Sequence, residues 1–472
     1  MSIRFGTDGW RAIMGWDFTA DKVRACAQGV AQYLAKTQLA SRGLVVGYDT
    51  RFASEAFAME VAKVSAGNAI KTLLSNKAVP TPVVSYSIID RHAGGGVIIT
   101  ASHNPPQWNG FKYKPEYGGS ASVEVVEALE TEIDSAIDNQ ILDVPLEIGK
   151  EKGLIEEVDL ATPYLAHIAE LVDLDAIRQS GLRVAVDAMY GAGSGYIPRL
   201  IDNNSSNVNE IHSERNPVFP GMAQPEPVSS NLTALSEYVV SNNIDVGLAL
   251  DGDADRAGII DERGRFISTL ETYALLCLYL LEVRELRGPL VKSITMTNMV
   301  YKLGQLFRVP VYETPVGFKY LGPVMQVKNA LAAGEESGGY AFRGHIPERD
   351  GILSDLFFLD LIVKTGKRPS ELVEYLFSKV GEHYFDRHDI GLDPNQRNNI
   401  VQRVAASNPV TLAGKRILKR DDLDGTRFQL EGGSWTLIRF SGTEPLLRIY
   451  AEGQSPQQVE QLLEDARSLA GV

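Results

Sequence analysis

The stretch that decides the fold class is LVVGY at residues 44–48, a short apolar run followed by helical apolar spacing over residues 54–70. A second short apolar run at residues 71–74 follows that helical segment. Short apolar runs bounded by turn residues are typical of strands that are buried on both faces. Strand, helix and strand in this order predict a unit of a parallel α/β sheet.

The same alternation continues along most of the chain. Further strands are expected at residues 97–100, 182–186, 246–250 and 293–296, and helices at residues 20–35, 123–137, 232–241 and 270–286. This pattern predicts α/β domains with mostly parallel sheets. The pattern changes near the end of the chain, where a helix at residues 371–380 and strands at residues 434–439 and 447–451 indicate an α+β unit.

Chain length and the positions of turn-rich segments predict four domains. A chain of 472 residues is too long to fold around one hydrophobic core. An acidic, Gly- and Pro-marked stretch at residues 143–155, a turn at residues 261–265 and the GKRP segment at residues 366–369 separate them. We therefore expect three α/β domains and a smaller C-terminal α+β domain, at residues 1–150, 151–258, 259–368 and 369–472.

Composition excludes several classes of protein. The chain has 46 Lys and Arg against 60 Asp and Glu, a net charge of −14, whereas general nucleic-acid binders carry a basic surface. An anionic ligand must therefore be held by locally clustered cations. Cys26 and Cys277 lie far apart in apolar stretches, which predicts two buried thiols and a reducing, cytoplasmic location. No signal-peptide pattern is present, and the apolar run at residues 273–281 is too short to cross a membrane.

A candidate nucleophile lies in the segment TASHNP at residues 100–105, where Ser102 follows an apolar run directly. A serine at the end of a strand can project its hydroxyl into a cleft and carry a phosphoryl group. His103 beside it offers a polar contact, and the prolines that follow stiffen the loop. The same letters also form an ordinary turn, and the segment lacks the G-x-S-x-G elbow of esterases.

A candidate metal site lies in DGDADR at residues 251–256, also directly after an apolar run. Alternate residues of an extended segment point to one side, so Asp251, Asp253 and Asp255 are expected to converge, and an all-oxygen set favours Mg²⁺. A calcium-binding EF-hand loop is the alternative, since Glu262 would occupy its last position. However, Arg256 stands where that loop requires glycine.

Two further loops carry ligand-binding chemistry. GEESGGY at residues 334–340 combines a carboxylate and a hydroxyl, which suit recognition of sugar hydroxyls, although an acidic surface turn is the alternative. RFSGTEP at residues 439–445, followed by Arg448, combines arginine, hydroxyls and glycine, as phosphate cradles do, although it would also serve as a turn between strands. YGAGSG at residues 190–195 has alternating glycines and is interpreted as a turn, because glycines alone are weak evidence for nucleotide binding.

Together these segments resemble the phosphohexomutase superfamily over nearly the whole chain, with FGTDGWR at residues 5–11 and NGFK at residues 109–112 as further matches. The resemblance implies three related α/β domains and a smaller fourth around a central cleft. It also implies that Ser102 is phosphorylated in the active enzyme. By position it implies a metal site at Ser102, Asp251, Asp253 and Asp255; catalytic roles for Ser102, Lys112, Arg11, His345 and His103; and substrate contacts at Glu335, Ser337, Lys319, Arg349, Arg256, Arg439, Ser441, Gly442, Thr443 and Arg448.

The expected activity is interconversion of hexose 1-phosphate and hexose 6-phosphate, with glucose foremost, through the phosphoserine and a hexose 1,6-bisphosphate. Lys112 or His345 would handle the proton, with Mg²⁺ as cofactor and glucose 1,6-bisphosphate as activator or intermediate. The protein is expected to be a monomer or a homodimer whose partners are small sugar phosphates. Gly338 and Gly339 occupy positions that vary between subfamilies, so the sequence does not determine which hexose is the substrate.

Two alternatives remain at this point. One is a hexose 1,6-bisphosphate synthase with a separate phosphoryl donor such as fructose 1,6-bisphosphate. The other is a non-catalytic sugar-phosphate-binding homologue, although such a protein would usually have lost the nucleophile or a ligand.

Overall fold

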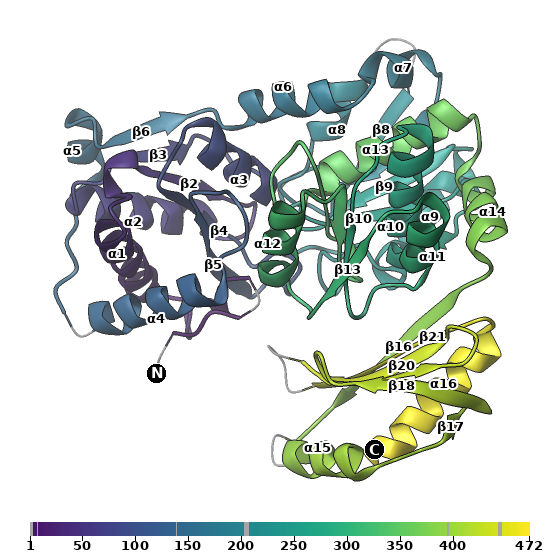
Figure 1. Ribbon diagram of the computed structural model, residues 1–472. Coiled ribbons are helices and arrows are strands. Elements are labelled where there is room, and N and C mark those ends of the chain that lie inside the picture. Colours follow the sequence, from purple (N-terminus) through teal and green to yellow (C-terminus); the bar gives the residue numbers. More distant parts are fainter. Residues whose placement is uncertain (1–2, 7, 138, 203–206, 394–395, 442–445) are drawn as a thin grey trace.

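The computed structural model describes all residues except 1–2, 7, 138, 203–206, 394–395 and 442–445 (Figure 1). Within the described residues the strands form four sheets, and we call the units around them the first to fourth domains. The first three domains lie together, and the fourth is a separate unit beside the third (Figure 1). This arrangement confirms the predicted α/β class and the α+β unit at the end of the chain.

The first domain has the sheet order β1-β5-β4-β2-β3-β6, in which β4, β2, β3 and β6 are parallel and β1 and β5 form an antiparallel edge. The strands are β1 (Trp10–Ile13), β2 (Leu44–Tyr48), β3 (Thr72–Ser75), β4 (Gly95–Ile99), β5 (Trp108–Pro115) and β6 (Ile155–Val158). The helices are α1 (Ala20–Lys36), η1 (Ala40–Arg42), α2 (Ser54–Gly67), α3 (Thr81–Asp90), α4 (Val123–Ile137) and α5 (Leu146–Glu151). Strand β6 returns to this sheet after the expected linker.

The second domain has the order β11-β10-β9-β7-β8, with β9, β7 and β8 parallel. Its strands are β7 (Arg183–Asp187), β8 (Asn207–Ile211), β9 (Val246–Leu250), β10 (Ala257–Ile260) and β11 (Phe266–Ile267). Its helices are α6 (Ala161–Leu171), α7 (Leu174–Gln179), α8 (Tyr196–Ile201), η2 (Ser229–Asn231) and α9 (Thr233–Ser241). Strands β9 and β10 form a hairpin whose connection is the segment 251–256.

The third domain has the order β13-β12-β14-β15, with only the β14–β15 pair antiparallel. Its strands are β12 (Leu290–Ser293), β13 (Val311–Thr314), β14 (Ala332–Gly334) and β15 (Tyr340–Phe342). Its helices are α10 (Thr269–Leu278), the π-helical turn η3 (Tyr279–Val283), α11 (Met299–Phe307), α12 (Phe318–Lys328), α13 (Gly351–Thr365) and α14 (Pro369–Val380). The strand expected at residues 293–296 lies earlier, because residues 290–293 pair with β13 and β14.

The fourth domain is an antiparallel sheet of order β16-β21-β20-β19-β18-β17. Its strands are β16 (Tyr384–Gly391), β17 (Thr411–Leu412), β18 (Lys415–Asp421), β19 (Thr426–Leu430), β20 (Trp435–Phe440) and β21 (Leu446–Gly453), and its helices are α15 (Arg397–Ala406) and α16 (Pro456–Ala470). Helix α14, which the sequence pattern placed in this last unit, packs instead against α10 and α11 of the third domain. Its apolar face, including Leu372 and Leu376, joins the core there.

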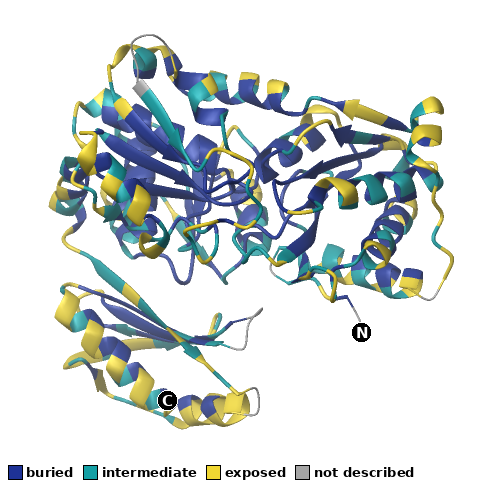
Figure 2. Ribbon diagram, turned by 180° about the vertical axis from the view of Figure 1, so that it is seen from behind, coloured by how far each residue is buried: buried dark blue, intermediate teal, exposed yellow. Residues whose placement is uncertain are grey.

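One hydrophobic core runs through the first three domains. It includes Val84 of α3, Ile168 of α6 and Leu353 of α13, all fully buried. The fourth domain has its own core around Ile449 and Leu462. Figure 2 shows the same division, with buried strands inside each unit and exposed residues on the outer helices. Cys26 and Cys277 are both buried free thiols, as predicted. Among the described helices, none combines the length and the apolar character needed to cross a bilayer.

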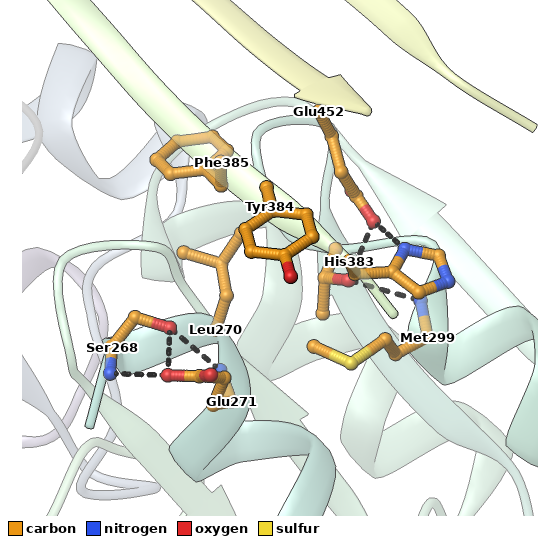
Figure 3. A pocket seen from close by; sticks show the side chains of 9 residues that line it. Ser268, Leu270, Glu271, Met299, His383, Tyr384, Phe385 and Glu452 are labelled. Atoms are coloured by element: carbon orange, nitrogen blue, oxygen red, sulfur yellow. Dashed lines mark hydrogen bonds and ion pairs between the residues drawn. The ribbon is translucent and has the colours of Figure 1, made fainter. Parts of the chain in front are cut away.

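The fourth domain is attached to the third through a buried carboxylate, Glu452 of β21. Its oxygens accept hydrogen bonds from Trp435 Nε1 at 2.7 Å, Thr297 Oγ1 at 2.9 Å and Asn298 N at 3.0 Å, and His383 Nδ1 also contacts it. Glu452, Thr297 and His383 line one side of a cavity of about 160 Å³ between the two domains (Figure 3). The carboxylate thus ties the start of α11 to the last sheet.

We expect Glu452→Ala to loosen this junction, because it leaves several buried donors without an acceptor, at about 1–3 kcal/mol for each unpaired group. The measurement is the rate of protease cleavage in the linker at residues 381–383, together with the melting temperature. The exposed Glu460→Ala is the control and should change neither. If the two variants have the same cleavage rate and the same melting temperature, this role for Glu452 is contradicted.

Candidate active site

Ser102 occupies a strained turn directly after β4. Its backbone is in the left-handed region, with φ of +50°, a conformation that costs free energy for a residue with a Cβ. Its amide donates to Thr100 Oγ1 at 2.8 Å, and its hydroxyl donates to Asp251 Oδ2 at 2.8 Å. The two loops meet closely, since a Cβ on Gly252 would lie 2.5 Å from the Ser102 carbonyl oxygen. The serine of the first domain therefore contacts the aspartate loop of the second.

The three aspartates converge as their spacing predicted. Asp251, Asp253 and Asp255 are fully buried, and one carboxylate oxygen from each lies within 4.8 Å of the others. Burial and the two neighbouring carboxylates raise the pKa of Asp251 well above its usual range. One oxygen each of Asp253 and Asp255 has no hydrogen-bond partner among the described residues. Buried oxygens left unpaired in a cluster of like charges fit a hard divalent cation such as Mg²⁺.

The EF-hand alternative is wrong in this structure. A strand and a hairpin surround the aspartate segment where an EF-hand needs helices. The carboxylate of Glu262 lies at α14, where it accepts a hydrogen bond from Ser370 N at 3.2 Å.

Lys112 reaches the same cluster from β5. Its ammonium nitrogen lies 2.8 Å from both Asp8 Oδ2 and Asp253 Oδ2 and 3.3 Å from Asp255 Oδ2. Burial favours the neutral amine, but the carboxylates outweigh it and raise the pKa of Lys112 above its ordinary value. The side chain is therefore a fixed positive charge within the aspartate cluster, one member of which, Asp251, contacts Ser102.

Arg11 on β1 and His103 flank the serine. Arg11 Nη1 donates to Asn104 Oδ1 at 2.6 Å, and His103 Nδ1 lies 3.3 Å from Ser102 Oγ. Burial, followed by the charges of Arg256 and Arg11, holds the pKa of His103 well below its usual range. The imidazole is thus neutral at pH 7, and the same surroundings oppose its protonation. Arg256 itself contacts Glu226 Oε1 at 2.6 Å.

Arg349 links three domains through its guanidinium. Nη2 lies 2.6 Å from Asp8 Oδ2 and 2.9 Å from Asp255 Oδ2, and Nη1 lies 3.8 Å from Glu335 Oε2. Glu335 also accepts a hydrogen bond from Gly317 N at 2.8 Å. Arg349 therefore joins the expected sugar loop at residues 334–340 to the aspartate segment at residues 251–256.

Sequence reasoning gave no role to Asp8, Lys114 or Glu348, which complete this charge network. Lys114 Nζ lies 2.9 Å from Asp8 Oδ1 and 2.6 Å from Glu348 Oε2. Burial opposes ionisation of Asp8, but Lys112, Lys114 and Arg349 hold its pKa well below the usual range. A signal was available in β5, because Lys112 and Lys114 are alternate residues of a strand and share one face.

His345 does not join the serine and the aspartates in any interaction described here. Its Nε2 lies 2.8 Å from Asp350 Oδ2, its Nδ1 lies 3.1 Å from His167 Nε2, and its ring stacks against His167. The proton-transfer role expected for His345 thus has no geometric support, since its ring nitrogens contact these two groups. Arg349, four residues further along the same loop, contacts the aspartate cluster instead.

The remaining predicted contacts surround the loop at residues 314–319. Lys319 is half-buried at the start of α12, with Nζ 5.4 Å from the centre of the Tyr320 ring, and Ser337 is half-buried on its turn. In the fourth domain, Arg439 Nε donates to Asp424 Oδ2 at 2.9 Å, and the same oxygen accepts from Val316 N at 3.0 Å. Asp424 thus joins the candidate phosphate cradle to this loop.

The other cradle residues lie near the end of β20 and on β21. Ser441 N donates to Leu446 O at 2.9 Å, and Arg448 Nε lies 3.7 Å from Asp389 Oδ1. Gly442 and Thr443 lie outside the described residues.

Comparisons with known proteins agree with this geometry. Models of the phosphoglucomutase/phosphomannomutase family match the chain in order: alpha/beta/alpha domain I at residues 2–140, domain II at 162–264, domain III at 271–380 and the C-terminal domain at 394–469. The chain belongs to this family. Its relatives include a protein named phosphoglucomutase/phosphomannomutase from Thermococcus kodakarensis, 32% identical over 98% of this chain and 96% of that protein.

Other family members carry different names. A probable phosphoglucosamine mutase from Methanothermobacter thermautotrophicus is also 32% identical, over 98% of this chain and 96% of that protein. Among solved structures, a putative phosphomannomutase from Thermus thermophilus matches with a TM-score of 0.86 and 32% identity, over 100% of both chains. The names of these relatives differ in the sugar and do not select one.

We predict that a divalent cation stabilises the folded protein through the aspartates. Mg²⁺ should raise the melting temperature of the wild type, because a ligand that binds only the folded state stabilises it. Asp253→Asn should weaken this effect by about tenfold or more in apparent affinity, since it removes a charged oxygen from the site. The exposed Asp175→Asn is the control. A wild-type melting temperature that does not change with Mg²⁺ would refute the prediction.

Gly339 makes room for Arg349, and this gives a second prediction. A Cβ at residue 339 would lie 2.3 Å from Arg349 Cδ, and the guanidinium is held by its carboxylate partners. Gly339→Ala should therefore lower the free energy of unfolding by about 1–3 kcal/mol, as overpacking does. Gly391→Ala, where the added Cβ meets nothing within 4 Å, is the matched control. Chemical denaturation measures both, and equal stability of the two variants would contradict the packing argument.

Proposed function

We propose that this protein is a Mg²⁺-dependent phosphohexomutase that interconverts hexose 1-phosphate and hexose 6-phosphate in the cytoplasm, with glucose phosphates as its foremost substrates. The observation that carries the proposal is the contact of Ser102 Oγ with Asp251, beside two further aspartates, Lys112 and Arg349. A hydroxyl, a hard-cation site and clustered cations within one buried network suit phosphoryl transfer better than other chemistry.

In this proposal Ser102 carries the phosphoryl group. The bond between phosphorus and Ser102 Oγ breaks as a bond forms between phosphorus and the free sugar hydroxyl, and the proton lost by that hydroxyl balances the one gained at Ser102. Mg²⁺ held by Ser102, Asp251, Asp253 and Asp255 would neutralise the charge that spreads over the transferring group. Lys112 and Arg11 add fixed positive charge, and the neutral imidazole of His103, with Nδ1 3.3 Å from Ser102 Oγ, can accept a hydrogen bond from the serine hydroxyl.

The sugar and its second phosphate would be held by the third and fourth domains. Glu335 and Ser337 contact ring hydroxyls, and Lys319 and Arg349 lie beside them. The cradle in the fourth domain holds the phosphate that is not reacting, through Arg439, Ser441, Gly442, Thr443 and Arg448. Arg387 of β16 supports this arrangement, because its Nη1 lies 2.9 Å from Glu336 Oε1, next to the sugar loop.

A mutase must return the other phosphate of the bisphosphate to the serine. The hexose 1,6-bisphosphate therefore turns over within the site, and either of its phosphates can occupy the cradle. Trace glucose 1,6-bisphosphate would prime the serine. Water must be kept from the phosphoserine, and the burial of Ser102 supports this requirement.

The test is conversion of glucose 1-phosphate to glucose 6-phosphate with Mg²⁺ and trace glucose 1,6-bisphosphate, alongside mannose and glucosamine phosphates. Ser102→Ala should lower kcat by on the order of a thousandfold or more, because it removes the phosphoryl carrier. Ser378→Ala, an exposed serine on α14, is the control.

Near-normal activity of Ser102→Ala would reject the role of Ser102. If free hexose bisphosphate accumulates when fructose 1,6-bisphosphate is added, the protein is a synthase and the mutase proposal is wrong.

A further inference from the structure

Arg51 binds the loop that carries Ser102, although the two lie far apart in sequence. Its side chain is completely buried and follows β2. One terminal nitrogen donates to the carbonyl oxygens of Ser102, at 2.6 Å, and of Asn104; the other donates to those of Pro105, at 3.0 Å, and Trp108, at 3.1 Å. One guanidinium thus gathers four carbonyl oxygens of a single loop.

The buried guanidinium of Arg51 needs a nearby carboxylate, because burying an unpaired cation costs free energy. The carboxylate that pairs with it is Asp49, with Oδ2 at 3.4 Å from Arg51 Nε. Burial lowers the pKa of Arg51 to about 10, which still leaves it charged at pH 7. The other oxygen of Asp49 accepts from Arg51 N at 2.9 Å and Ser54 Oγ at 2.7 Å, so the arginine itself is firmly placed.

These contacts of Arg51 fix the backbone conformation of Ser102. Arg51 holds its carbonyl oxygen, and Thr100 Oγ1 holds its amide. Both peptide groups that flank the left-handed φ of Ser102 are therefore fixed, and this conformation directs Oγ to Asp251. A guanidinium suits this task because it offers five donors in one plane, which a lysine ammonium does not.

The second domain supports the same arginine. The Phe219 ring lies 4.9 Å from the guanidinium carbon, and Arg215 donates to the carbonyl oxygens of Thr50 at 3.0 Å and Arg51 at 3.3 Å. Phe219 is fully buried. Asp251, the partner of Ser102, also belongs to the second domain. The interface between the first and second domains therefore positions both Arg51 and the aspartate that Ser102 contacts.

We propose that Arg51 is a positioning residue that directs Ser102 Oγ at the aspartate cluster by binding the carbonyl oxygens of its loop, with Phe219 holding the guanidinium from the second domain. This inference rests on the proposed phosphoryl transfer at Ser102. Arg51 binds the backbone of the loop that carries Ser102. Loss of its side chain should therefore lower kcat and leave KM for the hexose phosphate little changed.

The test is Arg51→Lys, which keeps the charge but cannot bind four carbonyl oxygens in a planar fork. We expect kcat to fall about 30- to 100-fold, as displacement of a reacting group by about 1 Å does, with KM for the hexose phosphate within about threefold. Arg42→Lys is the matched control, because Arg42 is exposed and its Nε donates to the carbonyl oxygen of His92. That variant should keep the wild-type kcat.

A second readout does not depend on mutase activity. Hydrogen exchange of amides at residues 101–108 should speed up about tenfold or more in Arg51→Lys and not in Arg42→Lys, because the loop loses its anchor. If the wild type proves to lack mutase activity, the proposed function fails while this exchange still decides whether Arg51 orders the loop. A kcat equal to wild type in a folded Arg51→Lys, or unchanged exchange, overturns the proposal.

Phe219→Leu covers the case in which Arg51→Lys does not fold. It keeps an apolar side chain but removes the ring face, so we expect a smaller fall in kcat, about 3- to 10-fold, again with KM little changed. An unchanged kcat in a folded Phe219→Leu would likewise overturn the proposal.

Discussion

The pairing of buried charges is the constraint on which the rest of this structure depends. Asp8, Asp253 and Asp255 are buried together with Lys112 and Arg349, and each would be costly alone in a low-dielectric interior. Because these residues come from three domains, their charges are satisfied only when the domains are assembled. The shared hydrophobic core supplies the packing, and the charge network specifies how the domains meet.

The same network arranges the chemistry. The aspartates alone would repel one another, and Lys112 and Arg349 balance their charge without occupying every carboxylate oxygen. Ser102 contacts this cluster from a turn with a left-handed backbone, and the candidate sugar loop is joined to it through Arg349 and Glu335. The fourth domain is attached differently, through Glu452 beside a small cavity (Figure 3). Its candidate phosphate-binding residue Arg439 is joined through Asp424 to the loop at residues 314–319. A candidate nucleophile in the first domain and a separate candidate phosphate site suit the proposed reaction, in which the ligand turns over.

Local sequence marks candidate site residues where polar side chains directly follow a buried strand. Ser102 after β4 and the aspartates after β9 are candidates for that reason, and for Ser102 the family resemblance decided between a nucleophile and an ordinary turn. The strand and helix patterns also predicted most elements of the first two domains. Contacts between distant residues were not predictable: Asp8 and Arg349 are 341 positions apart, and Arg51 has no pattern that marks it as a partner of the serine loop. The role predicted for His345 came from the family resemblance alone, and in the structure its ring stacks on His167. Helix α14 was assigned to the last unit because its neighbour in sequence is there, while its apolar face packs on the third domain.

The central claim is that Ser102 is the phosphoryl carrier beside a divalent cation. The most direct measurement is peptide mapping after incubation with glucose 1,6-bisphosphate labelled in its phosphates, with and without Mg²⁺, followed by a chase with unlabelled glucose 6-phosphate. The account predicts label on the peptide containing Ser102 and its transfer to sugar during the chase, fast only with Mg²⁺. Label on another residue, or label on Ser102 that the sugar cannot remove, would contradict it.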